Sequence, residues 1–280
     1  MSPASAAGGE VLLVGAGRMG GALLKGWLAG GRFSAIRVIE PNPSSELRDL
    51  AASKRIVLEQ HFTAAPKLAA IVLAMKPQVI KAEPGLLPEL GQAGALVVSI
   101  AAGIGTGLLG SLLGASRIAR AMPNTPGAIG KGITALYGGP SLSTADRDLA
   151  EHLMSGLGDT LWVADESLMD VVTAVSGSGP AYLFLMAEVL AAAGRAQGLD
   201  PASADRLARA TVSGAGALLA ADPRAASELR KEVTSPGGTT EAALKVLMGE
   251  GGLDALMAKA VDAATRRGRE LGAPSEKPKG

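Results

Sequence analysis

The sequence predicts an α/β protein in which a doubly wound parallel sheet, covered by helices on both faces, is followed by an all-α region. Two observations predict this. In the first half, short apolar runs typical of buried strands alternate with helical patterns. After about Asp165 the strand signals stop and long stretches rich in Ala and Leu take over. We therefore expect one domain over residues 1–165 and a helical domain over residues 166–280.

The expected strands of the first domain are short and apolar, as in a sheet that is buried on both faces. Leu90 to Ser116 contains no charged side chain and is long enough to suggest a membrane span. Gly103, Gly105, Gly107 and Gly110 are among the glycines that interrupt it, however, so a buried strand, a turn and a helix fit better. The clearest strands are Glu10–Gly15, Ile36–Glu40, Ala70–Met75, Leu96–Ile100 and Arg117–Ala121.

Composition excludes several functional classes. The 280 residues include 27 basic and 26 acidic side chains, so the net charge of +1 favours neither a nucleic-acid nor a membrane-binding surface. Cysteine is absent, which excludes disulfides, thiol nucleophiles and thiolate metal sites. His61 and His152 are the only histidines and belong to no metal-ligand pattern, so we expect no metal site.

The two ends of the chain carry little structural signal. Residues 1–10 lack both the positive start and the apolar core of a signal peptide, and we interpret them as a flexible lead-in. Residues 272–280 are mostly polar and contain two prolines, which is typical of a frayed tail. We expect a cytoplasmic protein.

A glycine-rich turn follows the first strand. Gly15 permits a tight turn, Gly17 lets the backbone approach a pyrophosphate, and Gly20 allows the next helix to pack closely on the strand. A helical pattern continues from Ala22 to Leu28. The strand, turn and helix together predict a dinucleotide site.

The second strand ends in Glu40-Pro41-Asn42-Pro43, where the adenosine ribose of a dinucleotide would be recognised. Glu40 suits a ribose 2′-hydroxyl and favours NAD, whereas the Asn42 amide suits a 2′-phosphate and favours NADP. No arginine lies at this strand end, so the choice between the two cofactors stays open here.

Two further motifs follow expected strands. Lys76, in Ala74-Met75-Lys76-Pro77, lies at the carboxyl edge of the sheet, where ligands of open α/β sheets bind. Asn124 lies in a loop stiffened by Pro123 and Pro126 and offers its amide to a nicotinamide or a substrate. A solvated lysine and a structural turn are the alternatives.

Two motifs of the helical half lie at expected helix starts. In Ser176-Gly177-Ser178-Gly179-Pro180, Ser178 is a candidate N-cap and Pro180 belongs to the first turn. The turn Ser235 to Thr240 contains two glycines before a helix, so its N–H groups can hold an anion such as a carboxylate. The Thr240 hydroxyl is a candidate N-cap and a candidate partner for a substrate nitrogen, and one role does not exclude the other.

Taken in order, the motifs GAGRMG, AMKP, MPNTP, SGSGPAY and VTSPGGTT resemble pyrroline-5-carboxylate reductases over nearly the whole chain. The resemblance implies reduction of 1-pyrroline-5-carboxylate to L-proline, the final step of proline biosynthesis, with NADP(H) or alternatively NAD(H). It also implies a Rossmann domain followed by a helical dimerisation domain, with dimers that often assemble further. The substrate is then a small molecule, and the partner is another copy of the chain.

The resemblance also implies functional residues. Thr240 would lie nearest the substrate ring nitrogen and is the candidate catalytic residue. Glu40 departs from the small residue often found there in NADP-preferring members, which puts strict NADP preference in doubt, and His61 matches an adenosine-contacting position poorly. The implied cofactor residues are Gly15, Ala16, Gly17, Arg18, Met19, Asn42, Ala74, Met75, Lys76, Pro77, Ala101, Ala102 and Asn124. The implied substrate residues are Ser235, Gly237, Gly238, Thr239 and Thr240.

A β-hydroxyacid dehydrogenase is an alternative, because that family has a similar glycine-rich start and a helical second domain. It would need a catalytic lysine on its interdomain helix, and Ser176 to Leu185 contains none. A nucleotide-sensing or scaffold protein would keep the glycine-rich turn but would not need Ser235 to Thr240. Reduction of a cyclic imine needs little acid-base help from the protein, since the cofactor carries the difficult step.

Overall fold

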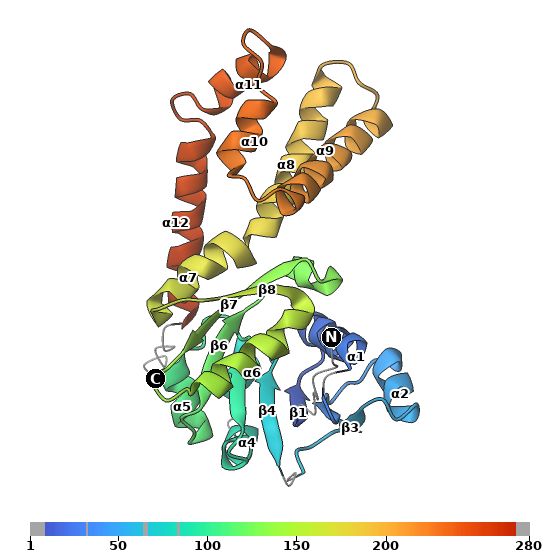
Figure 1. Cartoon of the computed structure of the whole chain (residues 1–280), viewed down its shortest axis with the longest axis vertical. Coiled ribbons are helices and arrows are strands. Elements are labelled where there is room, and N and C mark those ends of the chain that lie inside the picture. Colours follow the sequence, from blue (N-terminus) through green and yellow to red (C-terminus); the bar gives the residue numbers. More distant parts are fainter. Residues whose placement is uncertain (1–8, 32, 64–66, 83–84, 273–280) are drawn as a thin grey trace, which may run out of the picture. The chain divides into compact units, whose positions relative to one another are not determined.

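The computed structural model describes residues 9–31, 33–63, 67–82 and 85–272, which form two compact units (Figure 1). The sheet unit comprises the chain up to Gly177 together with the part from Ala264 onward. The helical unit comprises Ser178–Ala263. The connector Glu166–Gly177 therefore belongs to the sheet unit, and the domain limit at residue 165 stays a prediction.

The sheet unit contains one eight-stranded sheet in the order β3-β2-β1-β4-β5-β6-β7-β8. All neighbouring strands are parallel except β6 and β7. The strands are β1 (Glu10–Val14), β2 (Ile36–Ile39), β3 (Val57–Glu59), β4 (Leu68–Leu73), β5 (Leu96–Ser99), β6 (Ile118–Met122), β7 (Gly132–Gly138) and β8 (Gly158–Trp162). The helices are α1 (Arg18–Gly30), α2 (Ser45–Ala52), α3 (Pro77–Ala82), α4 (Leu86–Gln92), α5 (Thr106–Leu113), α6 (Thr144–Met154) and α7 (Met169–Val172).

The five expected strands are confirmed as β1, β2, β4, β5 and β6, and three further strands were not predicted. β7 runs against β6 because a short link, which includes a 3-10 turn at Thr125–Ile129, joins them. A parallel crossover needs a dozen or more residues. The doubly wound parallel sheet is thus confirmed, with β7 and β8 reversed at one edge. Leu90–Ser116 is divided among α4, β5 and α5, as expected.

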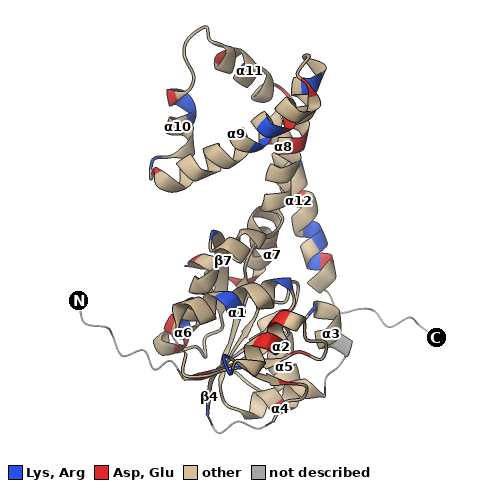
Figure 2. Ribbon diagram, turned by 90° about the vertical axis from the view of Figure 1, so that its right-hand side faces the viewer, with Lys and Arg blue, Asp and Glu red and all other residues tan. Residues whose placement is uncertain are grey.

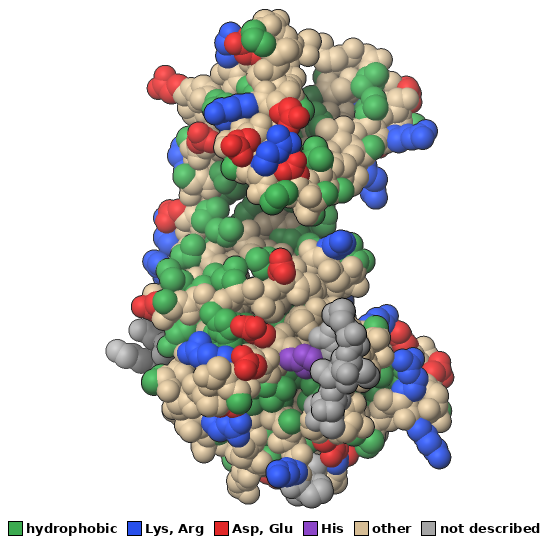
Figure 3. All heavy atoms as spheres, in the orientation of Figure 1, with side chains coloured by type: hydrophobic (Ala, Val, Ile, Leu, Met, Phe, Trp, Pro, Cys, Tyr) green, Lys and Arg blue, Asp and Glu red, His purple; other side chains and the backbone are tan. Residues whose placement is uncertain are grey.

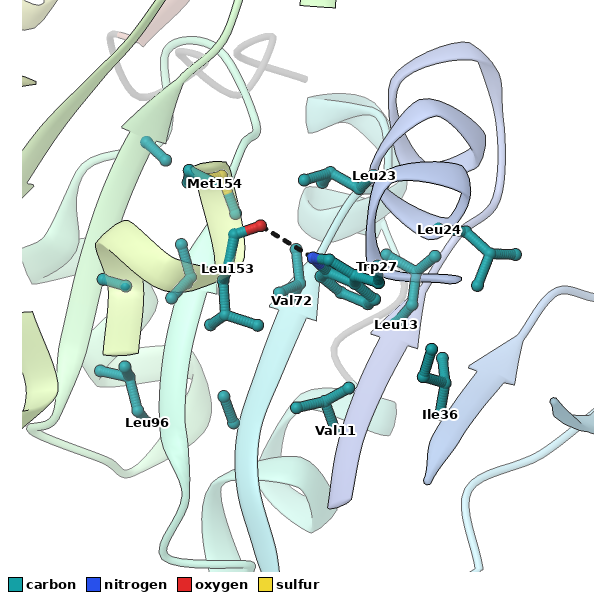
Figure 4. Close-up of a cluster of buried hydrophobic side chains, with 14 of the residues drawn as sticks. Val11, Leu13, Leu23, Leu24, Trp27, Ile36, Val72, Leu96, Leu153 and Met154 are labelled. Atoms are coloured by element: carbon teal, nitrogen blue, oxygen red, sulfur yellow. Dashed lines mark hydrogen bonds between the residues drawn. The ribbon is translucent and has the colours of Figure 1, made fainter. Parts of the chain in front are cut away.

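Two hydrophobic cores cover the two faces of the sheet, because successive side chains of a strand point to opposite faces. Val11 and Leu13 join the core that contains residues of α1 and α6, whereas Leu12 and Val14 join the core that contains residues of α3, α4 and α5. Figure 4 shows the first core, in which the indole Nε1 of Trp27 donates to the carbonyl of Leu153 at 2.8 Å. The helix that follows the β1–α1 turn is therefore packed on the sheet and tied to α6.

The helical unit contains α8 (Gly179–Ala196), α9 (Pro201–Ala221), α10 (Ala226–Glu232), α11 (Thr239–Leu247) and the first part of α12 (Leu253–Gly272). α8 and α9 pack against each other, and α9 is uncharged from Ala210 to Ala221, which leaves a long tan stretch in Figure 2. Within Ser178–Ala263 the buried hydrophobic side chains are those of three alanines. Many of its large apolar side chains are exposed, and Figure 3 shows apolar side chains on the surface of this unit. The exposed ones include Leu183, Phe184, Leu185, Leu207, Leu218, Val233, Val246 and Leu256.

One described helical stretch, Glu166–Ala196, is apolar and long enough to cross a membrane by composition and length alone. Only 11% of its most apolar window is buried within the chain. The expected lead-in and tail fall almost entirely outside the described residues.

Candidate functional site

Three glycines shape the turn between β1 and α1, each in a different way. Gly15 has a φ of +92°, and a Cβ there would lie 2.9 Å from the carbonyl oxygen of Ala74. A Cβ on Gly20 would lie 2.2 Å from the carbonyl oxygen of Gly15. At Gly17, by contrast, no described atom lies within 4 Å of the Cβ position. The fold itself requires Gly15 and Gly20, whereas the space at Gly17 is open to a ligand.

Helix α1 begins directly after this open glycine. Gly17 is its N-cap, and the described residues provide neither a side-chain cap nor an acidic side chain in the first turn. The N–H groups of that turn and the helix dipole therefore favour an anion. A dinucleotide pyrophosphate fits this end of the helix.

A cavity of about 960 Å³ opens beside the turn, at the carboxyl ends of β1, β2 and β4. It brings together six of the predicted cofactor residues and His61. Ala16, Arg18, Met19 and Pro77 belong to the same chain segments, whereas Ala101, Ala102 and Asn124 follow β5 and β6 and are not among the residues that line it. The predicted residues that line the cavity are Gly15, Gly17, Asn42, Ala74, Met75 and Lys76.

The cavity also has a wall that sequence reasoning missed. Gln60 and Phe62 follow β3, a three-residue strand too short to give a periodic signal. Val79 lies on α3, and Leu86 and Glu89 lie on α4. Only the pairing of β3 with β2 brings the first two beside Asn42.

Glu40 connects the glycine turn to the end of β2. Its Oε2 accepts a hydrogen bond from the N–H of Ala16 at 2.9 Å, and its Oε1 accepts one from the N–H of Asn42 at 3.1 Å. Both carboxylate oxygens are therefore held by backbone groups. The side chain lines the cavity while it ties two of its loops together.

Asn124 joins the loop after β6 to the connector. Its Oδ1 accepts from the N–H of Ile133 at 3.0 Å, and its Nδ2 donates to the hydroxyl of Ser176 at 3.4 Å. Ser176 lies in a π-helical turn, Thr173–Gly177, and such turns are frequent at functional sites. The structure thus links MPNTP to SGSGPAY, which are 52 residues apart at this contact.

A buried arginine, which was not identified from the sequence, contacts the connector Glu166–Gly177. Arg120 is 6% exposed, and its guanidinium lies 3.5 Å from a carboxylate oxygen of Glu166 and 3.9 Å from one of Asp170. Glu166 also accepts from the N–H and the hydroxyl of Thr106, both at 2.7 Å. This network holds the connector against β6 and the start of α5. Its partners are far apart in sequence, so no local signal predicts it.

A second ion pair, between Arg117 and Asp146, stabilises the first turn of α6. Ser143 and Asp146 form a capping box, and Arg117 donates to the buried Asp146 carboxylate. The hydrogen bond from Arg117 holds the pKa of Asp146 below its ordinary value, and Ser143 acts in the same direction, whereas burial opposes both. The pKa of Arg117 is raised by the same contact.

The predicted substrate turn lies in the helical unit. Gly237 has a φ of +72°, its N–H donates to a carboxylate oxygen of Glu241 at 2.7 Å, and the N–H of Gly238 donates to the Ser235 carbonyl at 3.0 Å. The interpretation of Thr240 as an N-cap is wrong, because α11 begins at Thr239 and Gly238 is the N-cap. The interpretation of the Thr240 hydroxyl as a partner for a substrate nitrogen stays a prediction.

Ser178 does occupy the N-cap position of α8, with Pro180 in the first turn, although within the described chain its side chain makes no capping hydrogen bond. Among the residues that the structure describes, no group of three or more His, Asp or Glu side chains is placed to hold a metal ion.

Comparisons with known proteins agree with this geometry. Residues 166–271 match the family model "Pyrroline-5-carboxylate reductase dimerisation", and residues 10–103 match "NADP oxidoreductase coenzyme F420-dependent". The chain is 39% identical to a pyrroline-5-carboxylate reductase of Pseudomonas aeruginosa, over 94% of this chain and 96% of that protein.

Two solved structures are also similar. A pyrroline-5-carboxylate reductase from Coxiella burnetii has a TM-score of 0.85 and 35% identity, and the match covers 94% of this chain and 98% of that one. A Plasmodium falciparum pyrroline carboxylate reductase with NADP bound shares the fold, with a TM-score of 0.77, 24% identity and the same coverage of both chains.

Proposed function

This chain belongs to the pyrroline-5-carboxylate reductase family, oxidoreductases that catalyse the last step of proline biosynthesis, and we propose how its residues divide the work. The cavity beside the β1–α1 turn holds NADP(H), with NAD(H) as an alternative. The turn Ser235 to Thr240 holds 1-pyrroline-5-carboxylate, which is reduced to L-proline. The open backbone at Gly17, beside a cavity at the carboxyl edge of the sheet, is the single observation that carries the cofactor assignment.

We assign the cofactor residues two kinds of contact, backbone N–H groups for the pyrophosphate and side chains for the rest of the dinucleotide. The first turn of α1, with Ala16 to Met19, receives the pyrophosphate. Lys76 contributes a cation at the end of β4, and Asn42 faces the adenosine ribose. Ala101, Ala102 and Asn124, at the ends of β5 and β6, receive the nicotinamide half, because a dinucleotide extends across the switch point of such a sheet. The family description "NADP oxidoreductase" supports NADP(H).

The substrate residues recognise a carboxylate and a ring nitrogen. Gly237 already donates its N–H to a carboxylate, that of Glu241, which supports the chemistry proposed for this turn. The N–H of Thr239 lies at the start of α11, where the helix dipole favours an anion, whereas the N–H of Gly238 donates to the Ser235 carbonyl. Thr240 offers its hydroxyl to the ring nitrogen, and Ser235 completes the turn.

When bound, NADP(H) would supply the hydride to the carbon of the imine, whose ring nitrogen is already protonated, so that the product is the neutral cyclic amine. The protein holds the imine in position and excludes water, and positioning alone supplies much of the acceleration. Thr240 orients the nitrogen by a hydrogen bond. No dedicated acid-base side chain is required for this chemistry.

The chain forms homo-oligomers, as its dimerisation domain indicates. We assign residues 166–280 to substrate binding and dimerisation, and residues 1–165 to the cofactor. The apolar surface of α8 and α9 supports self-association, which would cover the exposed part of Glu166–Ala196 without a membrane. A homodimer or larger assembly in the cytoplasm, without nucleic-acid or membrane partners, fits the near-zero net charge.

The test is the loss of reduced-nicotinamide absorbance with purified protein and 1-pyrroline-5-carboxylate, compared between NADPH and NADH. Turnover with either cofactor supports the proposal, and the two rates rank the cofactors. Folded protein that binds nucleotide but turns over neither mixture would contradict the substrate assignment.

A variant pair tests the substrate turn. Thr240→Ala should reduce imine turnover much more than nucleotide affinity. Thr234→Ala is the control, because the Thr234 hydroxyl donates to the carbonyl of Arg230 at 2.6 Å and so stabilises the C-terminal end of α10. Unchanged turnover in Thr240→Ala would remove its proposed role.

A further inference from the structure

We propose that Glu40 sets the cofactor selectivity of this chain, by opposing a 2′-phosphate and so allowing NADH to compete with NADPH. The inference rests on the proposed cofactor site, which it deepens. It is carried by the position of Glu40, by the way its carboxylate is held, and by the charges around it.

Glu40 stands directly after β2, where a dinucleotide-binding sheet meets the adenosine ribose. It lines the cavity together with Pro41 and Asn42. An acidic side chain at this point accepts hydrogen bonds from the ribose hydroxyls of NAD, and a 2′-phosphate would stand in the same place. The position therefore brings the carboxylate close to the one group by which the two cofactors differ.

The carboxylate cannot easily turn away, because backbone groups hold both of its oxygens. The N–H of Ala16 donates to one oxygen at 2.9 Å, and the N–H of Asn42 donates to the other at 3.1 Å. Each carboxylate oxygen has a further lone pair, so the group still accepts from a ribose hydroxyl. A phosphate brings only acceptors and negative charge, and it gains nothing from this carboxylate.

The surrounding wall offers little to offset that repulsion. Near the ends of β2 and β3 the cavity is lined by Pro41, Asn42, Gln60, His61 and Phe62, which include no Lys or Arg. The described lining residues include one such cation, Lys76, and it follows β4. An NADP site usually provides an Arg beside the 2′-phosphate. Here the exposed Asn42 amide is a neutral donor for that phosphate, which permits NADPH without strongly favouring it.

A purely structural role for Glu40 makes a different prediction. If its carboxylate only ties the Ala16 loop to the Asn42 loop, loss of the charge would weaken both cofactors by the same factor. If it opposes the 2′-phosphate, loss of the charge changes their ratio. The ratio therefore separates the two roles, whatever happens to overall affinity.

The experiment measures dissociation constants for NADPH and NADH by calorimetry, without substrate, in the wild-type protein and in Glu40→Gln. We expect the affinity for NADPH relative to NADH to rise by about tenfold or more when the charge is removed. Glu40→Ser, which removes the bridge as well as the charge, should shift the ratio in the same direction and serves if Glu40→Gln folds poorly. A ratio that stays within about twofold of wild type in both variants would overturn the proposal.

Glu89→Gln is the matched control, because Glu89 lines the same cavity from α4 rather than from the end of β2. Its ratio should stay at the wild-type value, and an equal shift there would contradict a local effect of Glu40. A steady-state comparison of kcat/KM with the two cofactors then follows. A shifted binding ratio without imine turnover would support the role of Glu40 and contradict the proposed substrate. Imine turnover with an unshifted ratio would support the substrate and contradict the role of Glu40.

Discussion

The side-chain amide of Asn124 donates to the hydroxyl of Ser176 while its oxygen accepts from the backbone of Ile133. The contact with Ile133 fixes which way the amide points, so its nitrogen faces Ser176. Two sequence motifs, 52 residues apart at this contact, are thereby joined at the end of β6.

Asn124→Ala leaves the N–H of Ile133 without its acceptor, so we expect the free energy of unfolding to fall by about 1–3 kcal/mol. Asn124→Asp keeps that acceptor and loses only the donor toward Ser176, so it should cost less stability. Urea denaturation of both variants measures the difference. Equal losses would mean that the Ile133 contact does not stabilise the loop.

Gly17 and Gly20 should respond in opposite ways to a side chain. Gly17→Val should leave the melting temperature nearly unchanged and greatly weaken nucleotide binding, because its side chain enters open space where the backbone approaches the ligand. Gly20→Ala should instead destabilise the fold by about 2 kcal/mol or more, since its Cβ would clash with the Gly15 carbonyl. Thermal unfolding and nucleotide titration measure the two effects.

Gly21→Ala is the control for Gly20, because its Cβ would lie 3.5 Å from the Ala16 carbonyl, an ordinary contact. Inside a helix it should be neutral or stabilise by about 0.5–1 kcal/mol. A Gly20→Ala protein as stable as Gly21→Ala would contradict the close packing of α1 on the β1 turn. Normal nucleotide affinity in Gly17→Val would contradict the role of Gly17.

Asp146 should make stability depend on acid pH. Its pKa is lowered in the folded protein, so the contribution is fully present above the unfolded-state pKa of about 3.9 and is lost as pH falls through the folded-state pKa. Asp146→Asn should therefore cost about 1–3 kcal/mol at pH 7 and progressively less below about pH 4.

Asp148→Asn is the matched control, since Asp148 is exposed on the same helix, and its effect should stay within about 0.5 kcal/mol at pH 7. Chemical denaturation at several pH values gives all the required free energies. A deficit in Asp146→Asn that is the same at pH 7 and pH 3 would show that the charge of Asp146 does not stabilise α6.

Phe184 should matter for assembly rather than for folding of one chain. It is 64% exposed on α8, so Phe184→Asp would be nearly neutral in a monomer but would bury a charge in an oligomer interface. We expect a smaller species by light scattering after size exclusion. Ile129→Asp is the control, because Ile129 is 78% exposed in the sheet unit and should leave the mass unchanged. An unchanged mass for Phe184→Asp would exclude this part of α8 from the interface.

Much of the sheet unit was predictable because its signals are local. Val11 to Val14 form a buried strand, and the glycine-rich turn after them ends that strand with a conformation that requires glycine. β3, β7 and β8 were missed because the first is very short and the others lack a strong apolar run. Their pairing comes from partners elsewhere in the chain.

The sequence by itself determined five of the strands and their order along the chain, the position of the glycine turn at the first strand end, and the motifs that identify the family. Each depends on residues within a few positions of one another. Only the tertiary structure decided that the carboxylate of Glu40 meets the N–H of Ala16, that Asn124 meets Ser176, and that Arg120 lies between Glu166 and Asp170. These contacts join segments 24 to 52 residues apart, so they exist only once the sheet has paired its strands.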